Sequence, residues 1–346
     1  MSKKKALDIS ISKIDSRGVI NGLHTNFINI KFKGNDINHT IVNTIRRTIY
    51  TLVPKFAFHP NDIKFKKNDS VFNNDYVKLR ISSLPIINKS YDKMVIQNEI
   101  STLDKVSQLE ENANKSNYES TITNIHELEQ IKTKHESELL NNLTIHFYAK
   151  NDTQNIMDVT TDNAEYYLTT KIDNIYTRPI IIIKLKPGEE FDVTCTASLN
   201  IPLYDSIYLN CAACSYEEIN DNEYNFYIES DRQISEIDII KRACKIIIFK
   251  LKELSIRILS QVKNNDIIAD LKVINENHTM GNLITRVLQD NTNIIFCGYM
   301  VDHIAVNELT ISYKTDGTSF SNIFKESILY LVSVFENICL NIDNLQ

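Results

Sequence analysis

The chain has 346 residues, of which 42% are hydrophobic and 24% charged, proportions ordinary for a globular protein of two or three domains. Its formal net charge of −6 disfavours a protein whose main partner is a phosphate backbone. The most apolar run, Pro179–Leu185, has the length of a buried strand and no secretory leader is visible, so we expect a soluble, intracellular protein.

A strand followed by a helix is the first structure that the sequence predicts. "INIKFKG" (28–34) alternates apolar and polar residues, as a half-buried strand does. In "NHTIVNTIRR" (38–47), either Asn38 or Thr40 can accept hydrogen bonds from the free N–H groups of a first helical turn, and Pro54 ends the helix. One apolar stripe recurs at helical spacing: Ile41, Ile45, Ile49 and Leu52.

The other face of this helix carries Asn43, Arg46 and Arg47. Three interpretations of the two arginines stay open: a solvated helix face, a planar donor fork that binds carboxylates or carbonyls of a partner protein, and a contact with phosphate. The acidic net charge makes phosphate the least favoured of the three.

A long insertion follows the strand-like "VPKFAF" and runs from 59 to 222. Residues 63–86 predict a strand and then a short helix that Ser70 caps. The apolar stripe of this helix is predicted to be Phe72, Tyr76 and Leu79. Residues 97–140 are hydrophilic and form either a solvated insertion or a dedicated docking element. Strands follow, with a turn at Gly188.

The interrupted unit then resumes with the strand "YNFYIES" (224–230) and a long helix over 235–262. The start of the first unit is then repeated, because "NHTMGNLITR" (277–286) nearly repeats 38–47. The second helix has the same two candidates for its cap, Asn277 and Thr279. "ADLKVIN" precedes the second copy as "INIKFKG" precedes the first, and "NIIFCGY" follows the second as "VPKFAF" follows the first. "ELTISYKTDG" (308–317) and a helix over 321–342 complete the second copy.

Both closing helices have apolar faces wider than one small sheet needs. We therefore expect an α+β fold in which two dimerisation units, each an antiparallel sheet with helices, pair as an intramolecular pseudo-dimer. The predicted domains are 1–58 with 223–263, an inserted mainly β domain at 59–222, and 264–346. The predicted interface residues are Ile41, Ile45, Ile49, Ile246, Ile247, Leu251, Leu283, Leu288, Leu331 and Phe335.

No catalytic constellation is recognisable. The phosphate-loop, dinucleotide, HExxH and GxSxG motifs are missing, and His39 and His278 at the helix starts favour capping or packing over catalysis. Cys211 and Cys214 are the only close pair among six cysteines. A structural zinc usually needs two such pairs, so buried small residues are favoured over a zinc site, and no cofactor is expected.

At this point the motifs resemble a known family. "NHTIVNTIRRTIYTLVPKFAF" resembles the first helix region of the bacterial RNA polymerase alpha subunit, in its N-terminal domain, and of the third subunit of eukaryotic RNA polymerase II. "KPGEEFDVTCTASLN" and the closing strand and helix are similar to the same family. From 274 onward, the His-Thr-Met-Gly-Asn-Leu signature with "FCGY" and "KTDG" resembles the eleventh subunit. The chain thus resembles a fusion of the two, of the kind found in large cytoplasmic DNA viruses (giant viruses).

The resemblance implies a non-catalytic assembly subunit of a multisubunit DNA-directed RNA polymerase, a platform that docks the two largest, catalytic subunits for transcription. It implies that the helix Asn43–Arg47 and the segment 76–86 touch the second-largest subunit, and that Gly281–Arg286 faces the largest. The docking residues so implied are Asn43, Arg46, Arg47, Tyr76, Arg80, Asn282 and Arg286.

Further expectations come with the family. Small subunits resembling the tenth and twelfth of polymerase II are implied as partners, and neither template contact nor membrane contact is implied. A viral member would work in the host cytoplasm (the viral factory) and enter the virion. Two departures stand out: the four-cysteine zinc loop of many relatives is replaced by the cysteine-free stretch 97–140, and Thr285 stands where the first copy has Arg46.

Two functions of other classes remain as alternatives. One is a stand-alone nucleic-acid-binding protein that uses basic residues near Arg46–Lys67, for which salt-dependent DNA affinity of the isolated chain would speak. The basic residues concerned are Arg46, Arg47, Lys64, Lys66 and Lys67. The other is a hydrolytic enzyme with an unrecognised site, which turnover by the isolated chain would reveal.

Overall fold

The computed structural model describes residues 7–16, 19–20, 23–24, 26–86, 142–168, 170–262, 267–301 and 308–345. The described residues form two compact units. The first includes Met1–Val53 and Asn210–Gln346, and the second Pro54–Thr102 and Glu119–Leu209. The hydrophilic stretch 97–140 lies outside the described residues.

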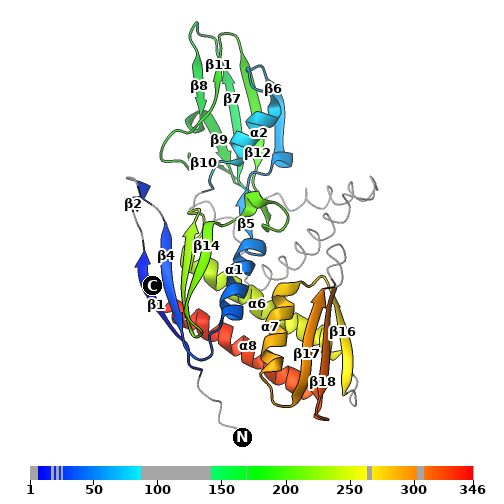
Figure 1. Ribbon diagram of the computed structural model, residues 1–346. Coiled ribbons are helices and arrows are strands. Elements are labelled where there is room, and N and C mark those ends of the chain that lie inside the picture. Colours follow the sequence, from blue (N-terminus) through cyan, green and yellow to red (C-terminus); the bar gives the residue numbers. More distant parts are fainter. Residues whose placement is uncertain are drawn as a thin grey trace. The chain divides into compact units, whose positions relative to one another are not determined.

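An antiparallel sheet of order β1-β4-β15-β14 opens the first unit (Figure 1). Its strands are β1 Ser10–Ser16, β4 Phe27–Lys33, β14 Cys211–Asn220 and β15 Glu223–Ser230, with a short pair beside them, β2 Val19–Ile20 and β3 Leu23–His24. The predicted alternation in β4 is present, because Ile28, Ile30 and Phe32 are buried and the residues between them are more exposed.

A second antiparallel sheet, of order β16-β18-β17, belongs to the same unit. Its strands are β16 Ile268–Ile274, β17 Ile294–Val301 and β18 Glu308–Thr315. Leu271 and Val273 of β16, with Leu309, Ile311 and Tyr313 of β18, form its buried face. Both sheets thus present one apolar face to helices.

Four helices cover these faces: α1 His39–Thr51, α6 Glu236–Leu259, α7 His278–Gln289 and α8 Phe320–Asp343. Asparagine starts α1 and α7, because Asn38 Oδ1 accepts from the N–H of Ile41 at 3.0 Å and Asn277 Oδ1 from the N–H of Thr279 at 2.9 Å. The choice left open between Asn and Thr as N-cap is therefore settled in favour of Asn in both copies.

Loss of either cap is expected to cost the same. Asn38→Ala and Asn277→Ala should each lower the free energy of unfolding by about 1 kcal/mol, because an N–H group of the first turn loses its acceptor. Urea titration followed by circular dichroism measures both. As a control, Asn344→Ala at the C-terminal end of α8 should have little effect, and a cap variant that matches it would contradict the assignment.

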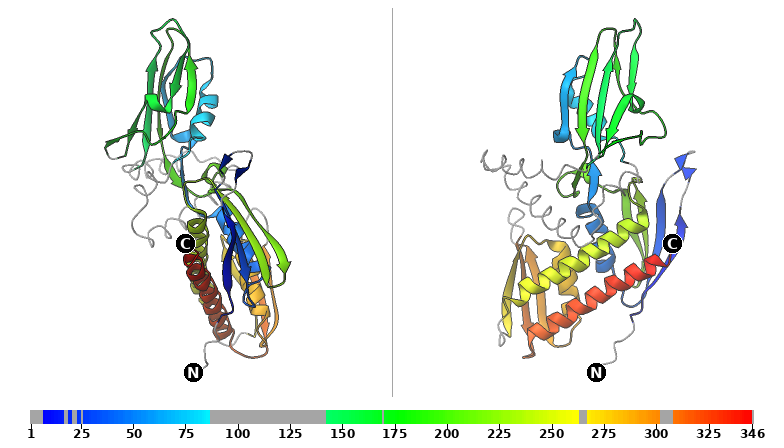
Figure 2. Two further views of the ribbon diagram at one scale, coloured as in Figure 1. Left: turned by 90° about the vertical axis from the view of Figure 1, so that its left-hand side faces the viewer. Right: turned by 180° about the vertical axis from the view of Figure 1, so that it is seen from behind.

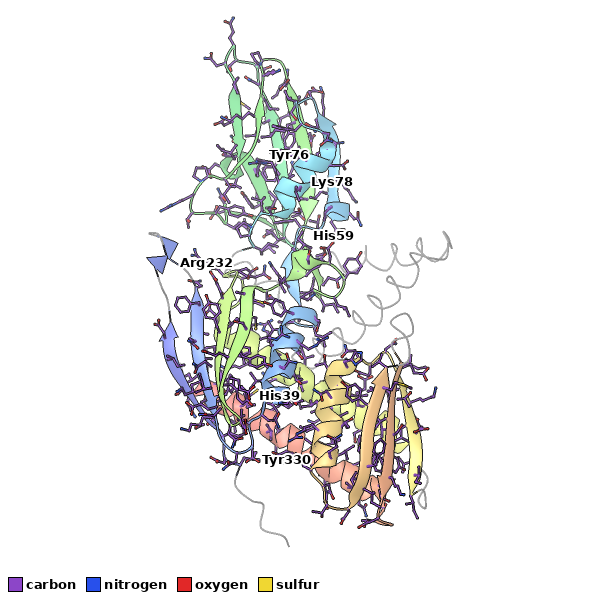
Figure 3. The ribbon with its side chains drawn as sticks, in the orientation of Figure 1. His39, His59, Tyr76, Lys78, Arg232 and Tyr330 are labelled. Atoms are coloured by element: carbon purple, nitrogen blue, oxygen red, sulfur yellow. The ribbon has the colours of Figure 1, made fainter. Side chains whose placement is uncertain are left out.

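The four helices contact one another across the two copies. α6 packs along α8, α1 contacts both α6 and α7, and α7 contacts α8 (Figure 2). Each closing helix also reaches the other copy: the side-chain amide of Gln261, just after α6, exchanges two hydrogen bonds with the backbone of Lys272 in β16, and Asn341 of α8 donates to the carbonyl of Ile9, next to β1. Tyr330 of α8, which is labelled in Figure 3, donates to Asp36 Oδ1 at 2.8 Å. The helices of the two copies therefore contact one another within the first unit.

The second unit is mainly β. A five-stranded antiparallel sheet has the order β10-β9-β7-β12-β6, β11 pairs with β8, and β5 pairs with β13. Its elements are β5 Lys55–Ala57, β6 Ile63–Asn68, α2 Asn74–Ser82, β7 Thr144–Lys150, β8 Met157–Thr160, β9 Ala164–Tyr167, β10 Lys171–Ile172, β11 Ile181–Leu185, β12 Glu190–Thr196 and β13 Ser198–Asn200, with short 3-10 turns at Pro60–Asp62, Thr161–Asn163 and Ser206–Tyr208. Gly188 adopts a φ of 81° in the turn before β12, the left-handed conformation that glycine tolerates.

The equivalence of "VPKFAF" and "NIIFCGY" is wrong. The strand that follows α1 in sequence, β5, pairs with β13 in the second unit. The position of β17 in the repeat is taken instead by β14, which pairs with β15 as β17 pairs with β18. The inserted stretch therefore leaves the first unit directly after α1 and returns before β14, so its limits differ at both ends from the predicted 59–222. At this junction Asn210 Nδ2 donates to the carbonyl of Val53 at 2.6 Å.

The predicted stripe of α2 is also wrong. Asn73 rather than Ser70 caps the helix, because its side chain accepts from the N–H of Tyr76 at 2.9 Å. Phe72 therefore lies before the helix, and the fully buried residues of the helix are Val77 and Ile81. The residues predicted to be buried are exposed instead: Phe72 by 42%, Tyr76 by 41% and Leu79 by 64%.

Candidate docking surface

The polar side of α1 carries a preorganised arginine. Arg46 donates from Nε and Nη2 to Asn43 Oδ1, at 3.1 and 2.9 Å, and its guanidinium carbon lies 5.9 Å from the centre of the Tyr50 ring. Residues three and four apart on a helix are neighbours, which is why these three side chains meet. The amide and the ring hold the half-buried guanidinium plane in one orientation.

Tyr50 connects the polar side of α1 to the sheet that contains β14. The backbone N–H of Cys214 in β14 donates to the Tyr50 phenol oxygen at 2.8 Å. Burial raises the pKa of Tyr50 above its usual value, so the phenol stays protonated near neutral pH and keeps a proton to donate. Tyr50 was missed in the sequence, although its position four residues after Arg46 was a usable signal.

Arg47 has a partner within the chain. Its side chain is exposed, and its Nε donates to Thr279 Oγ1 in the first turn of α7 at 2.7 Å. This bond crosses between the two copies of the repeat. The sequence offered Thr279 only as a possible cap, and a pattern within one helix could not have revealed a contact between residues so far apart in the chain.

On α7, Asn282 is half-buried and Arg286 is exposed. Arg286 Nη2 lies 3.8 Å from Asp290 Oδ1, a surface pair one helical turn apart that contributes little to stability. In the second unit, the exposed ring of Tyr76 stacks on Phe72 with centroids 4.5 Å apart, and Arg80 donates to the carbonyl of Ile181 at 2.7 Å. The implied docking residues therefore fall into a group of five on α1 and α7 and a group of two on α2.

The ten predicted interface residues all lie on the four helices of the first unit. None of them exposes more than 2% of its surface. Lys250 sits in the same apolar row of α6, also buried, with its Nζ 3.2 Å from Oε1 of the buried Glu276. The lysine in an apolar stripe was a visible signal, but its partner beside the Asn277 cap was not predicted.

Two stretches of the chain match family models described as the RNA polymerase Rpb3/Rpb11 dimerisation domain: residues 31–251 and residues 269–339. The chain belongs to the Rpb3/Rpb11 dimerisation-domain family. The first match spans β4 to α6 with the inserted unit, and the second spans β16 to α8. The helix that carries Arg46 and the helix that carries Arg286 therefore each belong to one Rpb3/Rpb11 match.

Individual relatives agree with this family. The chain is 24% identical over 329 residues, 90% of its length and 89% of the relative's, to a protein of Acanthamoeba polyphaga mimivirus named "Putative DNA directed RNA polymerase subunit R470". It is 35% identical over 63 residues, 44% of the relative, to the yeast DNA-directed RNA polymerases I and III subunit RPAC2. Over 49 residues, 54% of the relative, it is 41% identical to the archaeal subunit Rpo11 of Metallosphaera sedula.

The remaining candidates from the sequence are the close cysteine pair and the two histidines at the helix starts. Cys211 and Cys214 are buried on β14, and the hydrogen bond between their thiols and burial raise the pKa of Cys214, so it stays protonated. Within the described ranges, no three His, Cys, Asp or Glu side chains gather as a metal would need, and no helix is long and apolar enough to cross a membrane. His39 and His278 are the first residues of α1 and α7.

Two of the three lysines of β6 lie beside carboxylates. Lys66 Nζ lies 3.8 Å from Asp192, and Lys67 Nζ lies 2.8 Å from Glu190 and 3.2 Å from Asp69. These carboxylates offset the charge that a nucleic-acid-binding surface would need. The nucleic-acid alternative gains no support from this segment.

Proposed function

We propose that the two copies form an intramolecular pseudo-dimer that serves as a non-catalytic assembly subunit of a multisubunit DNA-directed RNA polymerase. The observation that carries the proposal is the exchange of closing helices. α6 follows the first sheet but contacts β16 of the second, and α8 follows the second sheet but contacts β1 of the first. A family that is named for dimerisation, matched twice in one chain, fits such pairing.

The outer faces of this pair would position the two catalytic subunits. We assign Asn43, Arg46 and Arg47, with Tyr76 and Arg80 of the second unit, to the second-largest subunit. We assign the face with Asn282 and Arg286 to the largest. Support comes from the orientation of Arg46, because a guanidinium held in place before binding loses little side-chain entropy when it meets carboxylates or carbonyls.

Other features of the proposal follow from the resemblance. Small subunits similar to the tenth and twelfth of polymerase II complete the assembly, and the chain contributes no catalytic group, no zinc or other cofactor and no template contact. Work in the host cytoplasm, at the viral factory, and packaging in the virion fit the relative from mimivirus, which has a similar length. We further propose that the inserted second unit and the stretch 97–140 are additions to the first dimerisation unit.

A pull-down with the tagged full chain tests the docking role. Arg46→Glu with Arg47→Glu should leave the fold nearly intact but reduce recovery of the two largest subunits about tenfold or more, because a charge inversion at the centre of an interface repels the partner's acceptors. Quantitative mass spectrometry of the copurified proteins measures the loss.

Two controls separate docking from folding and from net charge. Lys252→Glu with Lys325→Glu makes the same charge change on exposed positions of α6 and α8 and should leave recovery unchanged. Thr279→Ala removes the acceptor of Arg47 without changing charge and should also leave recovery largely unchanged. Undiminished recovery with the arginine variant would contradict the docking role.

A further inference from the structure

A buried ion pair lies where the two copies meet. Lys250 and Glu276 each expose only 5% of their surface, and Lys250 Nζ lies 3.2 Å from Glu276 Oε1. Lys250 belongs to α6, which closes the first copy, whereas Glu276 directly precedes the Asn277 cap of the second. Burying both charges is costly unless they meet, so their joint presence inside an apolar core calls for a physical reason.

The repeat defines an equivalent for each of the two residues. Asn38 and Asn277 cap the first helices of the two copies, and Ser235 and Ser319 directly precede the closing helices. Counted from Ser235 and Ser319, α6 and α8 have the same length, and every buried position of α6 except Ile246 corresponds to a buried position of α8. The count therefore aligns the two closing helices reliably.

By this count the equivalent of Glu276 is Ile37 and the equivalent of Lys250 is Val334. Both are fully buried. The same location in the pseudo-symmetric core thus holds an ion pair on one side and two apolar residues on the other. Lys250 and Glu276 are charged, whereas Val334 and Ile37 at the equivalent positions are apolar.

The register of the closing helices places these residues near the pseudo-two-fold axis. α6 and α8 are antiparallel, because Lys241 near the start of α6 pairs with Asp343 at the end of α8, and Cys244, one turn further along, shares a hydrogen bond with Cys339. Continued along α6, this register brings the buried lysine opposite its own equivalent on α8. Two first copies paired with each other would therefore set lysine against lysine.

We infer that the Lys250–Glu276 pair selects the unlike half as partner and prevents like halves of two chains from pairing. A first copy paired with a second chain's first copy would bury two lysines and no glutamate. A second copy paired with a second copy would bury two glutamates and no lysine. Only the pairing of a first copy with a second copy gives each buried charge an opposite charge. Because an unpaired buried charge is costly, this unlike pairing is favoured over both like pairings. The inference rests on the proposed pseudo-dimer.

Measurements of stability test whether Lys250 and Glu276 depend on each other in the folded chain. Lys250→Val alone should lower the folding equilibrium constant about a hundredfold, because it leaves Glu276 buried without its partner. Lys250→Val with Glu276→Ile, which copies the apolar version of the other half, should restore most of this loss. Lys252→Val, on the exposed face of α6, is the matched control and should change little.

A thiol reporter then detects like pairing directly. Ser255 on α6 is the equivalent of Cys339, so Ser255→Cys places a thiol opposite Cys244 of another chain only when two first copies pair. Cys339→Ser is added so that Cys244 cannot oxidise within its own chain. The full chain is refolded at about 0.1 mM, where encounters between chains compete with tethered pairing at an effective concentration of about 1 mM. Peptide mass spectrometry quantifies the disulfide that joins Cys244 of one chain to the thiol introduced at position 255 of another.

The expected result is a yield of linked dimers at least about tenfold higher in the Lys250→Val, Glu276→Ile background than with the native pair. Equal yields in the two backgrounds, whether high or absent, overturn the inference. A parallel sample with native Ser255 and Cys339 reports the Cys244–Cys339 link within one chain, and its absence would refute the pseudo-dimer itself. Because none of these readouts involves the large subunits, a failed pull-down would remove the docking role and leave the pairing rule standing.

Discussion

Replacing Ile45 by Asp is expected to lower the free energy of unfolding of the first unit by about 4 kcal/mol or more, enough to unfold most of it. Ile45 lies in the middle of α1 with no exposed surface, in line with Ile41 and Ile49. A carboxylate there loses its hydration, gains no partner charge and leaves part of the side-chain volume empty. Urea titration monitored by circular dichroism measures the change.

Two companion variants identify the cause. Ile45→Val keeps the site apolar and should cost only about 1 kcal/mol, so a larger loss with Asp reports the charge. Ile284→Asp changes the corresponding residue of α7, also fully buried, and should be as damaging as Ile45→Asp. Retention of the melting temperature by Ile45→Asp would show that this face of α1 is not in the core.

The second large effect is expected at Gly281, the glycine of the His-Thr-Met-Gly-Asn-Leu signature. A Cβ atom added there would lie 2.6 Å from Tyr299 Cδ2 and 2.7 Å from Leu309 Cδ1, closer than real contacts allow. Gly281→Val should therefore cost about 3 kcal/mol, because α7 has to move away from β17 and β18. Thermal unfolding of the full chain measures this loss.

A rescue variant tests the geometry of this contact. Tyr299→Ala removes the nearer obstacle, so its combination with Gly281→Val should lose less stability than the sum of the two single changes. Simple additivity would show that the ring of Tyr299 is not what excludes a side chain. The first copy has Val42 at the corresponding position, so the requirement for glycine belongs to the second sheet alone.

The repeated helices were predictable because their signals are local. The capping asparagines, the apolar stripes of α1 and α7 and the alternation in β4 all depend on residues within a few positions of one another. Strand pairing depends on residues far apart in the chain. The sequence predicts β5 as a strand and does not predict β14, and only the pairing of β14 with β15 and of β5 with β13 shows which of them belongs to the repeat.

The prediction of the buried face of the short helix α2 was wrong because the local signal is weak. Three apolar positions at helical spacing are too few to identify the buried face of a nine-residue helix, and Phe72 lies before the helix that Asn73 caps. Val77 and Ile81, four residues apart, form the buried face instead. At the docking surface, the local triad of Asn43, Arg46 and Tyr50 was within reach of the sequence, because its members lie one turn apart. The bond between Arg47 and Thr279 was not, since no pattern within one segment encodes it.

The junction at Val53 and Asn210 has a consequence for how such a chain can vary. The polypeptide leaves the shared core and re-enters it at neighbouring residues, which a hydrogen bond ties together. Because the exit and re-entry points are neighbours, almost no extra chain is needed to bridge them. The entropic cost of closing the loop rises only slowly as the inserted segment becomes longer. Whole modules can accordingly be lengthened, replaced or lost at this one position during evolution, while every helix that unites the two halves keeps its place.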